Sequence, residues 1–599
     1  MSQSQRYIAE AVSPYAHALS QSNLLRLISP RDTLERANEE LRRLTGVNQF
    51  FSTSQALTDF LEVLGLSSSA GHSDAGREWG DFQTPPGLAA QVCSYLSQTG
   101  VSPHVIVEPT YGAGNFVLAA LKAFPLARLV YGVEIQEKYE WQLKMSLLLE
   151  ALDGRRPSAE VELHWDDIFT HAFPTRILTA QNILIIGNPP WVTSAELSTL
   201  NSHNLPVKRN LKALKGMDAV TGKSNFDISE FVLLRLLSLF SGQRGTLAML
   251  CKNSIVKNMI EALPQQQFQV SNLRAIEIDA YREFGVSVEA SLLVMDLGVA
   301  DPTFTCGVAT LDQPDRIVRR FGWAGNRFVS NIDAYALSSE LDGTSPLLWR
   351  QGLKHDSAKV MELDLREGQC FNGKGESVEV EAHWVFPLLK SSDLRNFEVD
   401  RARKKVIITQ RRLGEDTTGL QARAPKLWKY LIGNREYFER RKSSIYRNKP
   451  LFSIFGIGEY SFKNYKVAIS GLYKLPCFSI LLPIAHQPVM LDDTCYFLGF
   501  DTYLDALLTA SLLNSPIVAQ FLQSIVFPDA KRPYTKEVLM RIDLAGAAAQ
   551  LSFGQIRTLW SDMNYEPRTP VTELDFEDYK HRVLNRDTQG EGFQYKLGV

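Results

Sequence analysis

An Asn-Pro-Pro-Trp tetrapeptide, Asn188 to Trp191, follows an apolar run at residues 183–186 that is typical of a buried strand. A single glycine separates the run from the tetrapeptide. Asn188 offers an amide oxygen, Pro189 offers a backbone carbonyl next to the rigid ring of Pro190, and Trp191 offers a flat surface for stacking. Together these groups can hold an exocyclic amine in plane and aim its lone pair at an electrophile. The alternative is a strand that ends in a Pro-rich turn, so the interpretation depends on a site for the electrophile elsewhere in the chain.

A loop with two glycines lies between a β-branched run, residues 105–107, and a helical segment, residues 116–123. It reads Glu108-Pro109-Thr110-Tyr111-Gly112-Ala113-Gly114-Asn115-Phe116. Gly112 and Gly114 let the backbone turn tightly and approach a ligand, and the helix that follows presents unpaired backbone N–H groups at its start. Because a third glycine is missing and the loop begins with Glu-Pro, the pattern favours a nucleoside without phosphate over a dinucleotide, with Glu108 available to a cationic amine.

Two further acids follow at the ends of predicted strands. Glu134 lies ~20 residues after the glycine loop, where an acid is placed to accept both hydroxyls of a ribose. Asp167 is placed to accept a hydrogen bond from the exocyclic amine of an adenine, and Ile135 and Ile168 can lie on either side of that ring. Each acid alone could be a surface or capping residue. Three acids in order at successive strand ends favour a nucleoside site.

The elements that position these residues alternate between strands and helices over residues 77–300, which predicts a mostly parallel sheet covered on both faces. The expected strands are residues 105–107, 129–133, 161–163, 183–186, 246–250 and 291–295, and the expected helices are residues 116–123, 137–152 and 230–240. Residues 1–75 have a helical pattern that includes an amphipathic segment at 32–41. The Ser/Gly-rich stretch 67–76 indicates a linker, and an apolar helical segment is expected at 503–526.

Composition sets limits on the class of protein. The 599 residues have the apolar and charged content of an ordinary globular protein, enough for three or four domains. The six cysteines lie far apart without a CxxC pair, which argues against a structural zinc site or a disulfide framework. No apolar run approaches the ~18 residues of a membrane span, and the first six residues lack the apolar core of a signal peptide. We therefore expect a cytoplasmic protein with no membrane partner and no metal.

Charge is unevenly distributed along the chain. Between Lys390 and Lys474 there are twenty Lys or Arg residues against eight Asp or Glu residues, although the whole chain has a net charge of −2. A segregated basic region on a nearly neutral protein is typical of a polyanion binder. Each cluster alone could be an ordinary solvated face, but the asymmetry as a whole favours nucleic acid.

The order of these motifs resembles a known family. Phe82-Gln83-Thr84-Pro85-Pro86 with an apolar helix, then EPTYGAGNF, GVEI, DDIF and NPPW, is similar to the motif set of S-adenosylmethionine-dependent amino-methyltransferases that act on adenine in DNA. The order is that of the gamma class, with cofactor motifs first, the catalytic tetrapeptide second and target recognition last. The family more often has Tyr or Phe where this chain has Trp191. The resemblance covers roughly residues 77–540.

The resemblance implies a fold and a domain order. The fold class is α/β, a Rossmann-like class I methyltransferase sheet with helices on both faces, plus a C-terminal mixed α/β target-recognition domain. The expected domains are a helical N-terminal extension at 1–75, the methyltransferase domain at 76–310, a connecting region at 311–380 and a basic DNA target-recognition domain at 381–599.

The resemblance also assigns roles to residues. Asn188, Pro189, Pro190 and Trp191 would be catalytic, and Phe284, in the segment Phe284 to Ser291, would pack on a flipped base. The cofactor S-adenosyl-L-methionine would be bound by a larger set, which is Thr84, Pro85, Glu108, Pro109, Gly112, Gly114, Phe116, Glu134, Ile135, Asp167, Ile168 and Asn188. The implied reaction is methyl transfer to the N6 amine of adenine in double-stranded DNA by base flipping, in a restriction–modification or phage-defence system with a separate endonuclease or other defence subunits.

Rival functions share parts of the pattern. An Asn-Pro-Pro-aromatic tetrapeptide also occurs in methyltransferases that act on guanine amines of ribosomal RNA or on protein amides, but those chains are usually shorter and lack the Gln-Thr-Pro-Pro segment and the basic C-terminal half. A fused nuclease is not expected, because residues 1–75 are too short and have no Asp…Glu-x-Lys cluster. An inactive DNA-specificity subunit is a further alternative, against which Asn188, Glu134 and Asp167 argue.

Overall fold

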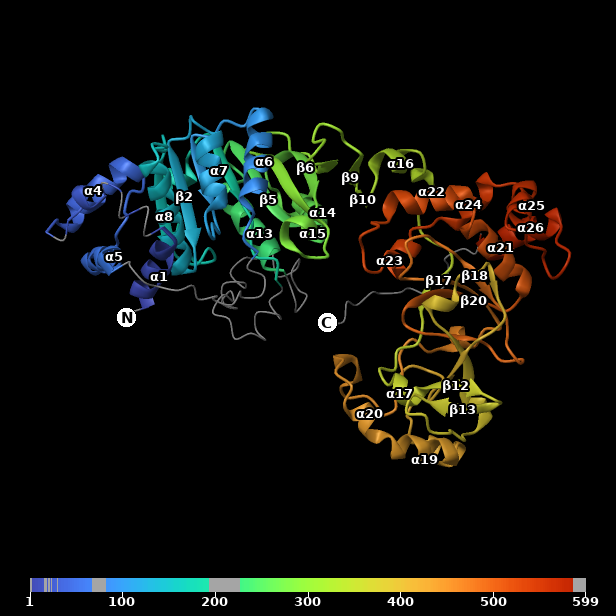
Figure 1. Cartoon of the computed structure of the whole chain (residues 1–599). Coiled ribbons are helices and arrows are strands. Elements are labelled where there is room, and N and C mark those ends of the chain that lie inside the picture. The colour runs from blue at the N-terminus through green and yellow to red at the C-terminus, as the bar shows by residue number, and fades with distance from the viewer. Residues whose placement is uncertain are drawn as a thin grey trace. The chain divides into compact units, whose positions relative to one another are not determined.

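The computed structural model describes residues 3–15, 19, 22, 24–29, 31–66, 82–192 and 227–584. By its internal packing the chain divides into two compact units, Met1–Phe328 and Val329–Val599 (Figure 1). The boundary falls inside the region expected to connect two domains, residues 311–380. The segment 67–76 that indicates a linker lies outside the described residues.

The first unit is built on a ten-stranded sheet with the order β10-β9-β8-β6-β7-β5-β4-β1-β2-β3. Its strands are β1 Val105–Glu108, β2 Leu129–Glu134, β3 Glu160–Trp165, β4 Ile183–Gly187, β5 Gly245–Lys252, β6 Val270–Ile278, β7 Ala290–Leu297, β8 Thr305–Thr310, β9 Arg319–Ala324 and β10 Arg327–Val329. Neighbours from β3 to β5 are parallel, whereas β7 is antiparallel to both β5 and β6. The strand order reverses between β1 and β4, which is where ligands bind in open α/β sheets.

All six predicted strands are confirmed, as β1 to β5 and β7. The predicted helices are confirmed as α7 Asn115–Ala123, α8 Glu137–Leu152 and α13 Ile228–Phe240, and the apolar helix after the Gln-Thr-Pro-Pro segment is α6 Pro86–Gln98. The remaining helices of the sheet are α14 Asn253–Gln266 and α15 Ala280–Phe284, with short α9 Thr175–Leu178 before β4. Every residue of β4 is buried, so the tetrapeptide that follows it leaves the centre of the sheet.

The N-terminal extension packs on the ten-stranded sheet and belongs to the same unit. Its helices are α1 Gln3–Val12, α3 Leu24–Leu27, α4 Leu34–Thr45 and α5 Ser54–Leu66, and the predicted amphipathic segment lies mostly in α4. Val47 forms a parallel bridge with Val161 of β3. The Lys144 ammonium, which is buried on α8, donates to the Phe50 carbonyl at 2.7 Å. The extension therefore continues the core of the first unit past the β3 edge.

The second unit contains two five-stranded sheets, in the orders β11-β20-β17-β18-β15 and β13-β12-β16-β14-β19. The strands are β11 Arg350–Gln351, β12 Glu362–Arg366, β13 Gln369–Asn372, β14 Val385–Leu389, β15 Glu398–Val399, β16 Lys404–Ile407, β17 Tyr465–Ser470, β18 Ser479–Leu481, β19 Met490–Leu491 and β20 Cys495–Phe500. Residues 350–372, expected only to connect domains, thus contribute strands to both sheets.

Helices accompany each sheet of the second unit (Figure 1). Helices α17 Ala358–Met361, α18 Leu420–Arg423, α19 Pro425–Gly433 and α20 Arg435–Glu439 belong with the β12 sheet. Helices α16 Ile332–Ala336, α21 Tyr503–Leu513, α22 Pro516–Ile525, α23 Lys536–Leu539, α24 Leu544–Gln550, α25 Phe553–Asp562 and α26 Glu573–Tyr579 make up the helical remainder. The predicted apolar segment 503–526 is confirmed as α21 and α22. Within the described part of the chain, no helix has the length and apolar character to cross a membrane.

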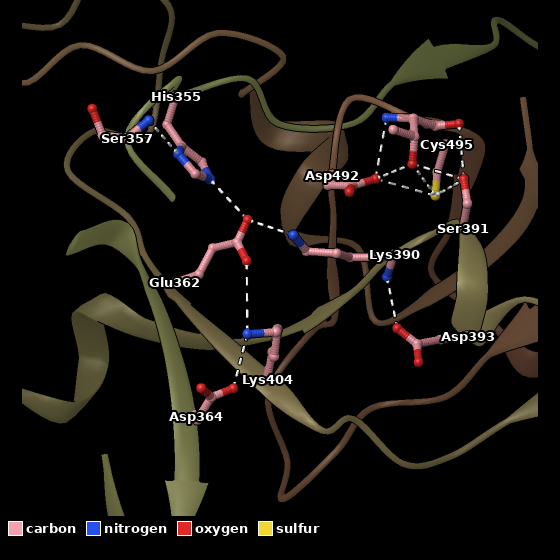
Figure 2. Close-up of polar contacts among 11 residues, drawn as sticks. His355, Ser357, Glu362, Asp364, Lys390, Ser391, Asp393, Lys404, Asp492 and Cys495 are labelled. Carbon is pink, nitrogen blue, oxygen red and sulfur yellow. Dashed lines mark hydrogen bonds and ion pairs between the residues drawn. The ribbon is translucent and has the colours of Figure 1, made fainter. Parts of the chain in front are cut away.

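A polar network links segments of both sheets in the second unit (Figure 2). The Glu362 carboxylate is buried and accepts from the Lys390 ammonium at 2.6 Å, with His355 Nε2 at 3.8 Å on the same oxygen. The Lys404 ammonium lies 2.8 Å from Asp364 and 4.0 Å from Glu362. Some of the lysines in the basic region are therefore neutralised inside the unit.

Glu362→Gln should lower the free energy of unfolding by about 1–3 kcal/mol, because it leaves the Lys390 ammonium without its buried carboxylate. Chemical denaturation of the full chain measures the change. Glu439→Gln is the matched control, since its pair with Arg435 is half exposed on both sides and should contribute less than about 1 kcal/mol. Equal effects of the two substitutions would contradict the role given to Glu362.

Candidate active site

A pocket with an empty volume of about 1080 Å³ lies at the carboxyl ends of β1, β2 and β4. Its lining comes from the segment before α6, from the loops that follow β1 to β4, and from the start of α13. The predicted site residues that line it are Thr84, Glu108, Pro109, Gly112, Phe116, Glu134, Ile135, Asp167, Ile168, Asn188, Pro189, Pro190 and Trp191. Pro85, Gly114 and Phe284 are not among the lining residues. One pocket thus gathers most of the predicted set.

The glycine loop is shaped by its contact with Glu134. The Gly112 N–H donates to one oxygen of the Glu134 carboxylate and the Gln136 N–H donates to the other, both at 2.9 Å. Gly112 has φ +47°, and a Cβ on it would lie 2.3 Å from the Gln83 Oε1 atom. Gly114 has φ +80° and faces Leu143 of α8, so this glycine serves helix packing.

The segment Phe82–Thr84 supplies contacts that the motif analysis did not single out. The Ala113 N–H donates to the Gln83 Oε1 atom at 2.7 Å, and the Asn115 Nδ2 group donates to the Thr84 carbonyl at 2.8 Å. Gln83 and Asn115 both line the pocket, as do Gln136 and Tyr139. Pro85 is the N-cap of α6 and places this segment against the glycine loop. The Gln-Thr-Pro-Pro pattern was the signal that could have identified Gln83.

Asn188 has its side chain oriented by the same segment. Its Nδ2 group donates to the Phe82 carbonyl at 3.1 Å. Its Oδ1 atom is buried and has no hydrogen-bond partner among the described residues. A buried acceptor left in this state costs about 1–3 kcal/mol. The amide therefore presents an acceptor that no described residue satisfies and that a bound molecule could engage.

Other buried polar atoms in the pocket also have no partner within the described residues. They are the Glu108 Oε2, Thr110 Oγ1 and Tyr111 hydroxyl atoms. Glu108 is 2% exposed. Burial raises the pKa of the Glu108 carboxyl well above its usual range, and the nearby charge of Glu134 raises it further. A ligand that brings an ammonium and hydroxyl groups would satisfy these atoms, which fits the amino acid and ribose of S-adenosylmethionine.

The Asp166–Asp167 turn after β3 is held from two sides. Asp166 pairs with His171 Nδ1 at 2.7 Å, and the Asp167 Oδ1 atom accepts from the Phe169 N–H at 2.9 Å. Arg235 of α13 donates to the Ile168 carbonyl at 2.6 Å and to the His171 carbonyl at 2.8 Å. Sequence reasoning did not find Arg235, because it lies mid-helix and acts on backbone oxygens rather than on a motif residue.

Trp191 is 5% exposed and belongs to an aromatic cluster. Its ring centroid lies 5.0 Å from that of Phe284 and 6.2 Å from that of Phe82. Its indole N–H donates to the Leu250 carbonyl at 3.4 Å. Phe284 thus contacts Trp191 but does not itself line the pocket. Its predicted stacking on a base remains a prediction.

Known proteins resemble the chain in sequence and in structure. The type II methyltransferase M.NspV from Nostoc sp. is 38% identical over 471 residues, which are 78% of this chain and 96% of that protein. The type II methyltransferase M.XamI from Xanthomonas campestris pv. amaranthicola is 31% identical over 180 residues, which are 28% of this chain and 31% of that protein. No model of a known protein family matches the chain.

Among solved structures, the type IIL restriction-modification enzyme MmeI in complex with DNA superimposes with a TM-score of 0.52 at 11% identity. The match covers 97% of this chain and 92% of MmeI. The fold is therefore that of a class I S-adenosylmethionine-dependent methyltransferase with further sheets in a C-terminal region. The chain belongs to the type II methyltransferase family and is a methyltransferase of the restriction–modification type, with S-adenosylmethionine as its cofactor.

S-adenosylmethionine should bind more weakly as the pH falls. Acidification protonates Glu108, whose pKa is raised by burial, and removes the charge that would pair with the ligand's ammonium. Glu108→Gln should weaken binding about ten- to a hundredfold, the equivalent of a charged hydrogen bond of ~1.5–3 kcal/mol, and abolish the pH dependence. Calorimetric titration at several pH values measures both effects.

Glu160→Gln is the control, because Glu160 is an exposed carboxylate on β3 outside the pocket lining. It should change neither the affinity nor its pH dependence. A wild-type affinity that stays constant as the pH falls would show that Glu108 does not pair with the ligand.

Proposed function

We propose that this protein is a site-specific DNA methyltransferase of the gamma class that methylates the N6 amine of adenine in double-stranded DNA after the base has flipped out of the helix. The orientation of Asn188 carries the proposal. Its Nδ2 group is engaged by Phe82, and its buried Oδ1 atom has no partner among the described residues. An acceptor fixed in this way suits a planar amine that enters the pocket.

Two acceptors of the tetrapeptide would act on the amine together. The amine of adenine is a poor nucleophile, because its lone pair is delocalised into the ring. If Asn188 Oδ1 and the Pro189 carbonyl accept its two hydrogens, the nitrogen becomes pyramidal and its lone pair points in one direction. The cofactor supplies an electrophilic methyl group on a sulfonium. The nitrogen would then displace the methyl group directly, the sulfonium would leave as a neutral thioether, and the amine would release one proton, so that no covalent intermediate on the protein is needed.

Positioning accounts for much of the expected rate enhancement. Holding two reactants in line can supply on the order of 7–11 kcal/mol of the barrier. Extrusion of the target base costs a few kcal/mol. Stacking on an aromatic residue contributes roughly 1–3 kcal/mol per base. Trp191, which is among the residues that line the pocket, is proposed to make this contact. Packing of Phe284 against Trp191 would keep that ring in place.

The second unit is proposed to bind the DNA. Arg403 and Lys404 form ion pairs within the unit. Other cations are largely exposed, such as Arg401, whose side chain is 94% exposed although it lies 3.7 Å from Asp400, and Arg411. The structural relative MmeI was solved with DNA, which agrees with this assignment. We further propose that the chain is the modification component of a restriction–modification or antiviral defence system, with a separate endonuclease or other defence subunits as partners.

Asn188→Ala should abolish DNA methylation while S-adenosylmethionine still binds, because the substitution removes an acceptor for the target amine and leaves the glycine loop intact. Methyl-specific sequencing of DNA from expressing cells measures the product, and calorimetry measures cofactor binding. Asn258→Ala is the matched control, since this amide bonds Glu230 and does not line the pocket. Methylated motifs that persist in Asn188→Ala, or a product other than N6-methyladenine from the wild type, would overturn the proposal.

DNA affinity should fall steeply with salt, because the exposed cations of the second unit displace counterions from phosphates. The logarithm of the binding constant should fall with the logarithm of salt concentration with a slope of about −0.9 per phosphate contacted. Fluorescence anisotropy with labelled duplex measures the slope. A flat response would contradict DNA binding by the basic region.

A further inference from the structure

A short loop of the second unit, Arg411 to Gly414, presents four exposed residues in a row. Leu413 is 62% exposed between Arg412 and Gly414. Gly414 has φ +79° and open space around the position of a Cβ, so the turn itself requires the glycine. An exposed leucine beside two arginines buries little surface on folding. This loop is therefore a candidate contact surface for a partner.

Hydrogen bonds and an ion pair with neighbouring residues hold this loop in place. The Glu415 carboxylate accepts from the Arg411 N–H at 2.7 Å and from the Arg412 N–H at 3.3 Å, and it pairs with Arg423 at 3.2 Å. Gln410 is fully buried, and its Nε2 group donates to the Arg412 carbonyl at 2.8 Å. The tip thus has a defined position before any partner binds, which lowers the entropy lost on binding.

The same glutamine ties the loop to a second segment. The Gln410 Oε1 atom accepts from the Ile454 N–H at 3.1 Å, and the Thr409 hydroxyl donates to the Phe452 carbonyl at 2.6 Å. That segment leads to the single turn η6 Glu459–Phe462. The Arg411 guanidinium lies 4.7 Å from the centroid of the Phe462 ring. The relative placement of residues 411–414 and Glu459 is therefore fixed by contacts on both sides.

Arg412 and Glu459 lie side by side at this junction. The Arg412 Nη2 and Glu459 Oε1 atoms are 3.6 Å apart, and the two side chains are 79% and 85% exposed. An ion pair so exposed contributes little to stability. The exposed pairs Arg435–Glu439 and Arg440–Glu436 join residues of one local helical stretch, whereas this pair joins two segments far apart in sequence. Because the pair contributes little to stability, contacts with a partner can replace it at little cost to folding.

The carboxylate distinguishes between two ways of contacting DNA. A protein surface that contacts only the DNA phosphates gains no affinity from Glu459, because its carboxylate and the phosphates are both negatively charged. In the major groove, however, guanine presents two acceptors to Arg, and cytosine presents an N4 donor to Glu. Guanine O6 and cytosine N4 are hydrogen-bonded to each other and lie about 2.9 Å apart. That spacing is comparable with the 3.6 Å between the two side-chain atoms.

We propose that Arg412 and Glu459 together read one G·C base pair of the target site in the major groove, with Arg412 on the guanine and Glu459 on the cytosine amine. Leu413 would lie against the edge of a neighbouring base. This inference rests on the proposed function as a DNA methyltransferase and adds the chemistry by which one position of the recognition sequence is chosen.

The first test compares methylated motifs from cells that express the wild type, Arg412→Ala or Glu459→Ala. The wild-type motif should contain a G·C pair, and both variants should lose discrimination at that one position, with the other positions kept. Arg6→Ala, which breaks an exposed Arg–Glu pair in the first unit, should leave the motif unchanged. A wild-type motif without a G·C pair, or an unaltered motif in both variants, would overturn the inference.

The second test changes the DNA instead of the protein. Replacing the relevant guanine by 7-deazaguanine removes the N7 acceptor and should weaken wild-type binding about tenfold, equal to ~1.4 kcal/mol. The Arg412→Ala variant should bind both duplexes equally, because the lost acceptor has no donor to pair with. An equal loss in wild type and variant would overturn the pairing. The pairing would also be overturned if Arg412→Ala weakened binding to all DNA sequences equally and lowered the salt slope by about 1, since these are the changes expected of a phosphate contact.

The proposed function and the proposed base-pair contact can fail separately. If the wild type methylates no DNA at all, the proposed function is wrong. If the wild type methylates a defined motif and the two variants leave its G·C position intact, only the assignment of Arg412 and Glu459 is wrong. Thermal melting of each variant should match the wild type, because both side chains are exposed.

Discussion

Hydrogen bonds from one short segment, residues 82–84, fix the two halves of the active site relative to each other. On one side the segment bonds to Ala113 and Asn115 of the glycine loop, and on the other it bonds to the amide of Asn188. The cofactor loop follows β1 and the tetrapeptide follows β4, so adjacent parallel strands already bring them close. The segment adds the finer constraint, because it decides which end of the Asn188 amide faces the pocket.

The pocket is also defined by what its residues lack. Buried carboxylate, hydroxyl and amide oxygens of the residues that line it have no partners among the described residues, a state that a folded protein normally avoids. Glu134 is different, because backbone N–H groups bond both of its oxygens before any ligand arrives. Glu134 is thus held in a set orientation, whereas the Glu108 Oε2 atom has no partner among the described residues. The free energy that folding loses at these atoms is recovered when a ligand of complementary polarity binds.

Much of the first unit could be predicted from the sequence, because its strands are short apolar runs and its site residues follow them directly. The strands β6, β8, β9 and β10 escaped prediction, since polar residues interrupt their apolar pattern, as Asn272 and Arg274 do in β6. Contacts that depend on tertiary structure, such as the bonds from Arg235 to backbone oxygens, leave no motif in the sequence. In the second unit, local charge counts predicted a basic region but could not show that Lys404 lies against carboxylates.

The two sheets of the second unit are interleaved in sequence. β14 pairs with β19 across about a hundred intervening residues, whereas β15 and β18, which lie between them in the chain, pair in the other sheet. β11 and β20, the first and the last strand of this unit, pair with each other. Neither sheet is therefore formed by one continuous stretch of the chain. An exchange of this unit between relatives would have to transplant the whole span from β11 to β20, because any shorter graft would separate paired strands of at least one sheet.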